Sequence, residues 1–305
     1  MSTSSTSPPS ISTSLDGKSA LVTGAGAGLG RAEALALAVA GASVVVNDSD
    51  KDAAQGVVDE ITAAGGQAVT AAGDVSSWAV AEDLVQTAIS SFGQLDVLVN
   101  NAGVLRDRTI FNISESEWDT VIAVHLKGHA GTSRFATAHW RDRAKATGAP
   151  VYGRVINTSS EAFLFGSGGQ PNYAAAKAGI VALTLATAQS CERYGVRANA
   201  ICPRARTAMT TAVFGDAPEG VDPLSVDHVT PLVAYLASPA ADLVNGQVFV
   251  AYGPMVVLAT APGVERRFDA GGETWTTGEL ARSIGSHFTE RDLDVNFVAK
   301  AFYAL

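Results

Sequence analysis

The sequence predicts an α/β protein with a doubly wound parallel sheet and helices on both of its faces. Short apolar segments such as 42–47 and 96–100 alternate with longer segments of helical pattern such as 51–64. This alternation is typical of repeated βα units, in which helices connect parallel strands. The hydrophobic content of 47% supplies enough apolar side chains to bury both faces of such a sheet.

The first predicted βα unit contains a glycine-rich turn. Residues 18–23 form a predicted strand, glycines follow at positions 24, 26, 28 and 30, and residues 31–40 have an Ala/Leu-rich helical pattern. Glycines there let the backbone approach a pyrophosphate at a helix N-terminus, where unpaired N–H groups and the helix dipole favour an anion. A glycine cluster can also be merely a tight turn, but its position between a strand and a helix favours a dinucleotide site.

The second predicted strand, 42–47, ends on a carboxylate. Asp48 lies eighteen residues after Gly30. A carboxylate at that position accepts hydrogen bonds from the adenosine ribose hydroxyls and repels a 2′-phosphate, so Asp48 indicates NAD rather than NADP. The alternative is that Asp48 caps the helix predicted over 51–64, a role that Asp50 could also fill.

A tyrosine and a lysine open another predicted helix. Tyr173 and Lys177 are four residues apart and therefore share one helix face. An ammonium group beside a phenol lowers the phenol pKa from its usual value of about 10, which suits proton transfer to or from an alcohol near pH 7. Ser160 follows the apolar run 154–157, and its hydroxyl could hydrogen-bond a substrate oxygen. Alone, the Tyr/Lys spacing could equally be an ordinary helix pair.

Taken together, these motifs resemble the short-chain dehydrogenase/reductase family. They are T-G-x-x-x-G-x-G over 23–30, N-N-A-G over 100–103, Ser160, and Y-x-x-x-K from Tyr173 to Lys177, with the family's spacing of thirteen between serine and tyrosine. The resemblance covers about residues 15–255 and implies one Rossmann-type domain with a seven-stranded parallel sheet.

The resemblance also implies roles for individual residues. Tyr173 would be the acid/base, Ser160 would position the carbonyl, and Lys177 would hold the nicotinamide ribose and lower the tyrosine pKa. The implied NAD site comprises Gly24, Gly28, Leu29, Gly30, Asp48, Asp74, Val75, Asn101, Gly103, Tyr173 and Lys177.

Three further segments resemble a narrower group. N-N-A-G-V-L-R-D-R over 100–108, Trp118-Asp119, and V-H-L-K-G over 124–128 are similar to the (3R)-hydroxyacyl-CoA dehydrogenase modules of peroxisomal multifunctional enzymes, also called 17β-hydroxysteroid dehydrogenase type 4. This implies an NAD-dependent oxidoreductase of lipid or steroid metabolism, acting on a (3R)-3-hydroxyacyl-CoA or a 17β-hydroxysteroid. One alternative is a 3-oxoacyl-carrier-protein reductase, which N-Y-A-A-A-K-A-G over 172–179 also resembles but which should favour NADPH. The other is a binding protein that senses NAD without chemistry.

Two residues depart from the usual family pattern. His125 stands where most members have asparagine, although the narrower group also tends to have histidine; its imidazole could relay protons or simply pack in a helix. Arg204 replaces the glycine after Pro203. A bulky cation there changes the backbone options beside the nicotinamide pocket, or reaches an anionic substrate group.

The region around the expected substrate site offers further candidates. Residues 204–229 fall where the family has a mobile lid, and Met209, Val213 and Phe214 suit a hydrophobic substrate. Arg106 and Arg108 could contact the acidic groups of coenzyme A, or could be solvated surface side chains.

The ends of the chain and its charge complete the prediction. Residues 1–14 form a Ser/Thr/Pro-rich head expected to be disordered, 15–255 the catalytic domain, and 256–305 an extension packed on that domain as an oligomer clasp or a cover over the substrate mouth. The helices predicted over 117–147 and 173–193 would, by resemblance, form the interface of a homodimer or homotetramer.

The net charge of -9 argues against nucleic acid as a partner, and no apolar run approaches the length of a membrane span. Without a transit or secretion signal, the expected location is the cytoplasm. Cys191 and Cys202 form neither a disulfide framework nor a metal-binding pattern, so no metal is expected.

Overall fold

An eight-stranded sheet in the order β3-β2-β1-β4-β5-β6-β7-β8 forms the centre of the structure. The computed structural model describes residues 12–210, 215–260, 263–272 and 274–291. The chain divides into two compact units, Met1–Leu258 and Ala259–Leu305, and the whole sheet belongs to the first. The strands are β1 (Ser19–Thr23), β2 (Ser43–Asp48), β3 (Ala68–Ala72), β4 (Val97–Asn100), β5 (Gly153–Thr158), β6 (Val196–Pro203), β7 (Val248–Tyr252) and β8 (Met255–Leu258).

Seven strands are parallel, which confirms the doubly wound α/β prediction, and the eighth is antiparallel. The resemblance implied seven strands and assigned residues from 256 onward to the extension. Instead, a two-residue turn at Gly253 and Pro254 returns the chain beside β7, with Tyr252 paired to Met255. Gly253 has a φ of +52°, a conformation that glycine adopts without steric cost.

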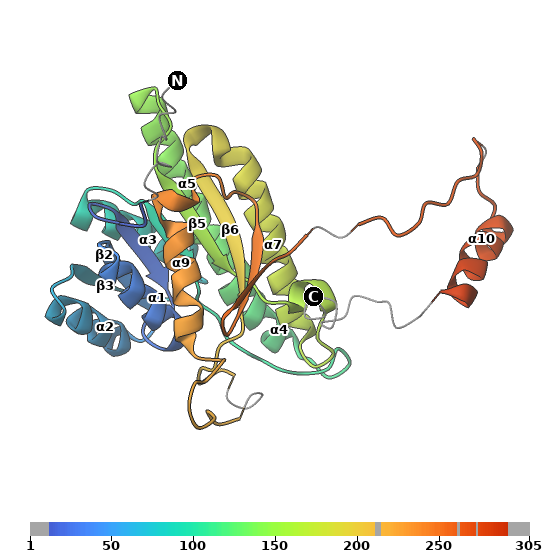
Figure 1. Ribbon diagram of the computed structural model, residues 1–305, viewed down its shortest axis with the longest axis horizontal. Coiled ribbons are helices and arrows are strands. Elements are labelled where there is room, and N and C mark those ends of the chain that lie inside the picture. Colours follow the sequence, from blue (N-terminus) through green and yellow to red (C-terminus); the bar gives the residue numbers. More distant parts are fainter. Residues whose placement is uncertain (1–11, 211–214, 261–262, 273, 292–305) are drawn as a thin grey trace, which may run out of the picture. The chain divides into compact units, whose positions relative to one another are not determined.

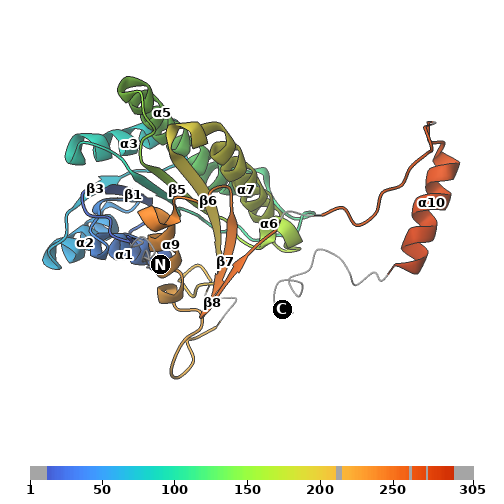
Figure 2. The same cartoon turned by 45° about the horizontal axis from the view of Figure 1, so that its top comes forward.

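Helices cover both faces of the sheet (Figures 1 and 2). One layer contains α1 (Gly28–Val39), α2 (Lys51–Ala63) and α9 (Thr230–Ala237), and the other contains α3 (Trp78–Phe92), α5 (Gly128–Thr147) and α7 (Pro171–Cys191). Strand β2 shows why both faces are apolar. Val44 and Val46 belong to the core on the α1 side, whereas Val45 belongs to the core on the α3 side, and all three are fully buried.

The strand order places one crevice at the middle of the sheet. Strand β1 pairs with β2 on one side and with β4 on the other, so the connections that leave the carboxyl ends of β1 and β4 run in opposite directions along the sheet. Ligands of open α/β sheets bind at such a switch point. The glycine turn after β1 and the N-N-A-G segment after β4 both lie at this edge.

The helix predicted over 117–147 is interrupted. It consists of α4 (Glu115–Ile122), a π-helical turn η1 (Ala123–Lys127), and α5. Single π-helical turns inside α-helices are frequent at functional sites. The turn contains His125, whose side chain is buried.

The second unit contains α10 (Thr277–Glu290). Thr276 and Glu279 form a capping box at its start. None of the helices in the described part of the chain is long and apolar enough to cross a membrane.

The core contains a buried acidic residue, Glu33, for which the structure shows no function. Glu33 lies on α1 with no exposed surface, and neither carboxyl oxygen has a hydrogen-bond partner among the described residues. Burial raises the pKa of Glu33 to about 8, so the side chain is protonated at neutral pH.

We expect Glu33→Gln to stabilise the protein at pH 8 and to have little effect at pH 5. The folded state retains a proton that the unfolded chain releases above its ordinary pKa of 4.5, so the free energy of unfolding falls as the pH rises from there toward 8. The total effect is on the order of a few kcal/mol. Urea unfolding at both pH values measures the change in the free energy of unfolding. The control is Glu82→Gln, at an exposed position on α3. An equal pH dependence in the wild type and in Glu33→Gln would contradict it.

Candidate active site

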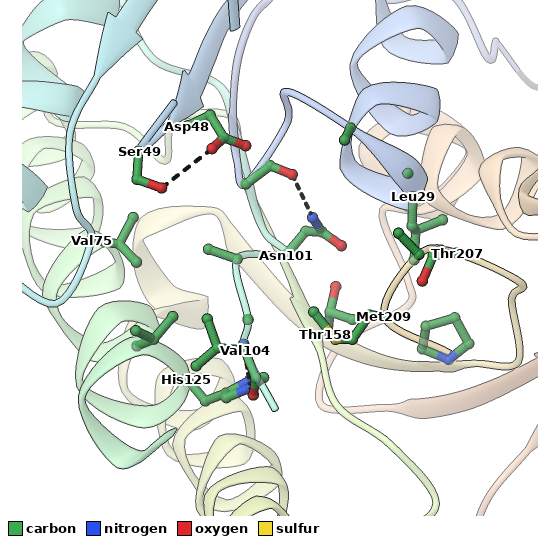
Figure 3. Close-up of a pocket in the computed structure, with 18 of the residues that line it drawn as sticks. Leu29, Asp48, Ser49, Val75, Asn101, Val104, His125, Thr158, Thr207 and Met209 are labelled. Atoms are coloured by element: carbon green, nitrogen blue, oxygen red, sulfur yellow. Dashed lines mark hydrogen bonds between the residues drawn. The ribbon is translucent and has the colours of Figure 1, made fainter. Parts of the chain in front are cut away.

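A cavity of about 460 Å³ lies at the carboxyl ends of the central strands. Figure 3 shows side chains from distant parts of the sequence, including Asp48, Asn101 and Thr158, around this one space. Of the predicted site residues, those that line it are Gly24, Gly28, Leu29, Asp48, Asp74, Val75, Asn101, Gly103, Tyr173 and Lys177. Gly30 and Ser160 are not among the lining residues.

The glycine turn is needed for a close backbone approach. A Cβ on Gly24 would lie 2.7 Å from the Cα of Ala102, and Gly24 has a φ of +62°. A Cβ on Gly30 would overlap the Gly24 carbonyl oxygen and the Asn101 side-chain amide. Gly30 is therefore a packing residue rather than a lining residue. The Ala27 cap makes no side-chain hydrogen bond to the first turn of α1, which leaves an N-terminus suited to an anion.

Asn101 joins the ends of β1 and β4. Its side-chain Nδ2 donates to the carbonyl oxygens of Thr23 and Gly24, each at 3.1 Å. The Thr23 hydroxyl oxygen accepts from the backbone N–H groups of Asn101 and Ala102 at 3.0 and 3.2 Å. Asn101 thus lines the cavity while its amide holds the glycine turn.

Asp48 presents its carboxylate beside the same turn. Its Oδ2 accepts from the backbone N–H of Gly26 at 2.9 Å, and its Oδ1 accepts from the backbone N–H of Asp50 at 3.0 Å. Asp50, not Asp48, is the N-cap of α2 and accepts from two first-turn N–H groups. The helix-cap alternative for Asp48 is therefore wrong.

Tyr173, Lys177 and Ser160 come together as predicted. The Ser160 hydroxyl is close enough to Tyr173 to lower the pKa of the phenol. Lys177 Nζ lies 5.3 Å from the centroid of the Tyr173 ring and donates to the carbonyl oxygen of Thr158 at 2.6 Å. The first two turns of α7 therefore carry Tyr173 and Lys177, and the end of β5 and the residues just after it supply Thr158 and Ser160.

The predicted lowering of the Tyr173 pKa by Lys177 does not occur in this structure. Burial raises the pKa of Tyr173 to about 12, against a smaller lowering by the Ser160 hydroxyl. Lys177 is only 2% exposed, and burial lowers its pKa to about 7. Burial disfavours the charged phenolate and the charged ammonium alike, so a smaller fraction of Lys177 is protonated at neutral pH.

His125 forms one wall of the site. Its ring lies 5.3 Å from the Tyr173 ring, edge to face at 90°. Nε2 is 3.0 Å from the backbone nitrogen and 2.8 Å from the carbonyl oxygen of Val104, and the tautomer decides which bond forms. A Cβ on Gly103 would overlap this ring, which explains the glycine there. Burial lowers the pKa of His125 to about 3, so the imidazole is neutral.

Sequence reasoning missed Asn172 and Thr158. The Asn172 Oδ1 accepts from the backbone N–H of Tyr173 at 2.8 Å, and its Nδ2 donates to the carbonyl oxygens of Arg106 and Glu117 at 3.1 and 3.3 Å. Asn172 was visible as the residue before the Y-x-x-x-K motif. Thr158 has no motif signal, because it acts through its backbone carbonyl.

The other substrate-side candidates differ in position. Met209 lines the cavity together with Thr207 and Thr210, whereas Val213 and Phe214 lie outside the described residues. Arg106 and Arg108 are exposed and do not line the cavity. Arg108 pairs with Glu117 at 3.2 Å. Cys202 is buried, and burial raises the pKa of its thiol to about 12.

Comparison with known proteins agrees with this geometry. The sequence profile of the family described as short chain dehydrogenase matches residues 18–217. The chain is 56% identical over 298 residues to the hydroxyacyl-CoA dehydrogenase ChsB1 of Mycobacterium tuberculosis, covering 94% of this chain and 93% of that protein. It is 41% identical over 243 residues to the peroxisomal multifunctional enzyme type 2 of Mus musculus, covering 77% of this chain but 31% of that longer protein.

A solved structure shares nearly the whole fold. It is a short chain dehydrogenase from Mycobacterium avium, 46% identical, with a TM-score of 0.83 over 93% of this chain and 99% of that one. The glycine turn, the Tyr/Lys pair in the cavity and these comparisons lead to one conclusion. The chain belongs to the short-chain dehydrogenase family and is an oxidoreductase.

Proposed function

We propose that the protein interconverts a secondary alcohol and a ketone with NAD, and that its preferred substrate is a (3R)-3-hydroxyacyl-CoA. The observation that carries this proposal is the placement of Tyr173 and Lys177 in the same cavity as the glycine turn and Asp48. When bound, the nicotinamide supplies the hydride acceptor or donor. The protein supplies the binding surface and a proton-transfer group.

Tyr173 is the proposed proton-transfer group. Tyr173 lines the cavity, and the Ser160 hydroxyl beside it is proposed to hydrogen-bond the substrate oxygen. Because burial keeps the phenol protonated in the free protein, Tyr173 is ready to donate a proton in ketone reduction. Alcohol oxidation requires the phenolate, so that direction is favoured by rising pH.

Asp48 supports NAD as the cofactor. Its carboxylate lines the cavity at the end of β2, and the neighbouring Ser49 also lines it. A 2′-phosphate placed there would meet a negative charge, whereas ribose hydroxyls would find an acceptor. The uncapped N-terminus of α1 and the close-packed glycines fit a pyrophosphate beside it.

The substrate proposal combines the cavity lining with the relatives. Pro203, Ala208 and Met209 give the substrate side an apolar surface, which suits an acyl chain or a steroid skeleton. The relative with 56% identity bears the name hydroxyacyl-CoA dehydrogenase. A 17β-hydroxysteroid remains the second candidate because it needs the same alcohol chemistry and the same apolar surface.

We also propose that the enzyme is a cytoplasmic homodimer or homotetramer associating through α5 and α7. Helix α7 exposes a stripe of small and apolar side chains. The stripe consists of Ala175, Ala182, Leu185 and Ala186.

The substrate proposal predicts that purified enzyme reduces NAD with (3R)-3-hydroxyacyl-CoA thioesters far more efficiently than with 17β-hydroxysteroids or simple secondary alcohols. A screen of kcat/KM by NADH absorbance, across acyl chain lengths and with both cofactors, measures this. Turnover of simple alcohols without thioesters would overturn the assignment. A preference for NADPH and acyl-carrier-protein thioesters would favour the reductase alternative.

Tyr173→Phe is expected to lower kcat by about 10³-fold while the NAD dissociation constant stays within about twofold, because only the phenolic proton is lost. Steady-state kinetics and NADH fluorescence titration measure the two quantities. In the wild type, kcat/KM for alcohol oxidation should rise with pH, since burial holds the pKa of Tyr173 above its ordinary value. A Phe variant with most of its activity would exclude Tyr173 as the acid/base.

Asp48→Ala is expected to lower kcat/KM for NAD by about 10- to 100-fold, because the ribose hydroxyls lose their hydrogen-bond acceptor. The preference for NAD over NADP should also narrow, because the 2′-phosphate of NADP no longer meets a negative charge. The matched control is Asp50→Ala, which removes the α2 cap and should lower stability by about 1 kcal/mol without changing the cofactor ratio. An unchanged ratio in Asp48→Ala would count against NAD selection by this carboxylate.

A further inference from the structure

A two-pronged ion pair joins the loops that follow β5 and β6. Arg204 Nε lies 2.6 Å from Glu161 Oε2, and Nη2 lies 3.4 Å from Oε1. The side chains are 30% and 14% exposed, respectively, so both are partly withdrawn from solvent. Pairs with this fork geometry and partial burial are more directional than ordinary surface pairs.

The acidic partner is adjacent to the Ser160 hydroxyl in the chain. Glu161 directly follows Ser160 and occupies the N-cap position of α6 (Ala162–Phe165). Ser160 Oγ accepts from the backbone N–H of Ala162 at 3.3 Å, and the same hydroxyl lowers the pKa of the nearby Tyr173. A restraint on Glu161 therefore also restricts the backbone that carries the Ser160 hydroxyl.

The basic partner is anchored on the sheet. The backbone N–H of Arg204 donates to the carbonyl oxygen of Ala251 on β7 at 2.9 Å. Its guanidinium lies 5.3 Å from the centroid of the Tyr252 ring. Strand β6 and this aromatic contact give Arg204 a fixed position from which it can hold the serine loop.

We propose that the Arg204–Glu161 pair is a positioning device that holds the Ser160 hydroxyl against Tyr173. The proposal rests on the proton-transfer role of Tyr173 and Ser160 in the proposed function. It also gives Arg204 a purpose other than binding an anionic substrate group, since its guanidinium is already engaged by a carboxylate. A misplacement of about 1 Å in a catalytic group can reduce turnover 100-fold.

A second ion pair nearby joins Arg206 to Asp222. Arg206 Nε lies 2.9 Å from Asp222 Oδ2, and the Arg206 backbone N–H donates to the carbonyl oxygen of Leu224 at 2.6 Å. These contacts bring Arg206 next to residues 222 and 224. The segment that starts after Arg206 contains the lining residues Thr207 and Met209. The first pair therefore joins the start of this segment to Glu161 after β5, and the second pair joins Arg206 to Asp222 near its other end.

Arg204→Ala and Glu161→Gln are expected to lower kcat by about 10- to 100-fold, with KM and the NAD dissociation constant within about twofold. Arg204→Lys should fall between, because lysine keeps the charge but not the fork. The exchanged pair Glu161→Arg/Arg204→Glu should recover most of the lost kcat. The matched control is Arg197→Ala, which removes a pair with Asp242 at the opposite end of β6 and should leave kcat unchanged.

Hydrogen–deuterium exchange over residues 159–166 tests the same device without turnover. Exchange should increase in Arg204→Ala, return toward the wild-type rate in the exchanged pair, and stay unchanged in Arg197→Ala, with similar Tm values throughout. This readout remains valid if no hydroxyacyl-CoA is oxidised, an outcome that overturns the proposed substrate alone. If Arg204→Ala kept both the wild-type kcat and the wild-type exchange rate over this segment, the positioning proposal would be overturned. A rise in KM for acyl-CoA but not for a neutral alcohol would instead assign Arg204 to substrate binding.

Discussion

The junction between the ends of β1 and β4 is the constraint on which the rest of the site depends. Asn101 and Thr23 exchange hydrogen bonds across 78 residues of sequence, and the space between them admits no Cβ at Gly24 or Gly30. These contacts hold the glycine turn against the end of β4, so the N-terminus of α1 faces the cavity. The backbone N–H of Gly26 can then donate to the Asp48 carboxylate. Glycine is thus required by packing at Gly30, whereas at Gly24 it is required by both packing and backbone conformation.

A buried polar network fixes the other side of the site. Asn100 Nδ2 donates to Asn157 Oδ1 at 2.9 Å, and Asn157 Nδ2 donates to Thr184 Oγ1 at 2.8 Å. These bonds connect β4, β5 and α7 in the interior, where satisfied polar groups strongly specify one arrangement. Since the first two turns of α7 carry Tyr173 and Lys177, the network also holds these two groups near the end of β5. The π-helical turn then brings the neutral ring of His125 against Tyr173.

Local patterns predicted most of the fold and the site. Alternating strands and helices, the glycine turn, and the four-residue spacing of Tyr173 and Lys177 each act within one βα unit or one helix turn, so they are legible in a single sequence. Strand β8 was missed because a short apolar run at an edge has no pattern that separates it from a tail. The π-helical turn at His125 was missed because it preserves the helical periodicity on both sides.

The sequence by itself determined that the chain builds a parallel α/β sheet, that a glycine turn opens its first helix, and that Tyr173 and Lys177 share a face. These features depend on neighbours in the chain. Only the tertiary structure decided the charge states and partners: a phenolate and an ammonium both disfavoured by burial, Asp48 bound to Gly26 rather than capping α2, and Arg204 paired with Glu161. Desolvation and ion pairing are set by side chains that meet in space, and no spacing along the chain reports them.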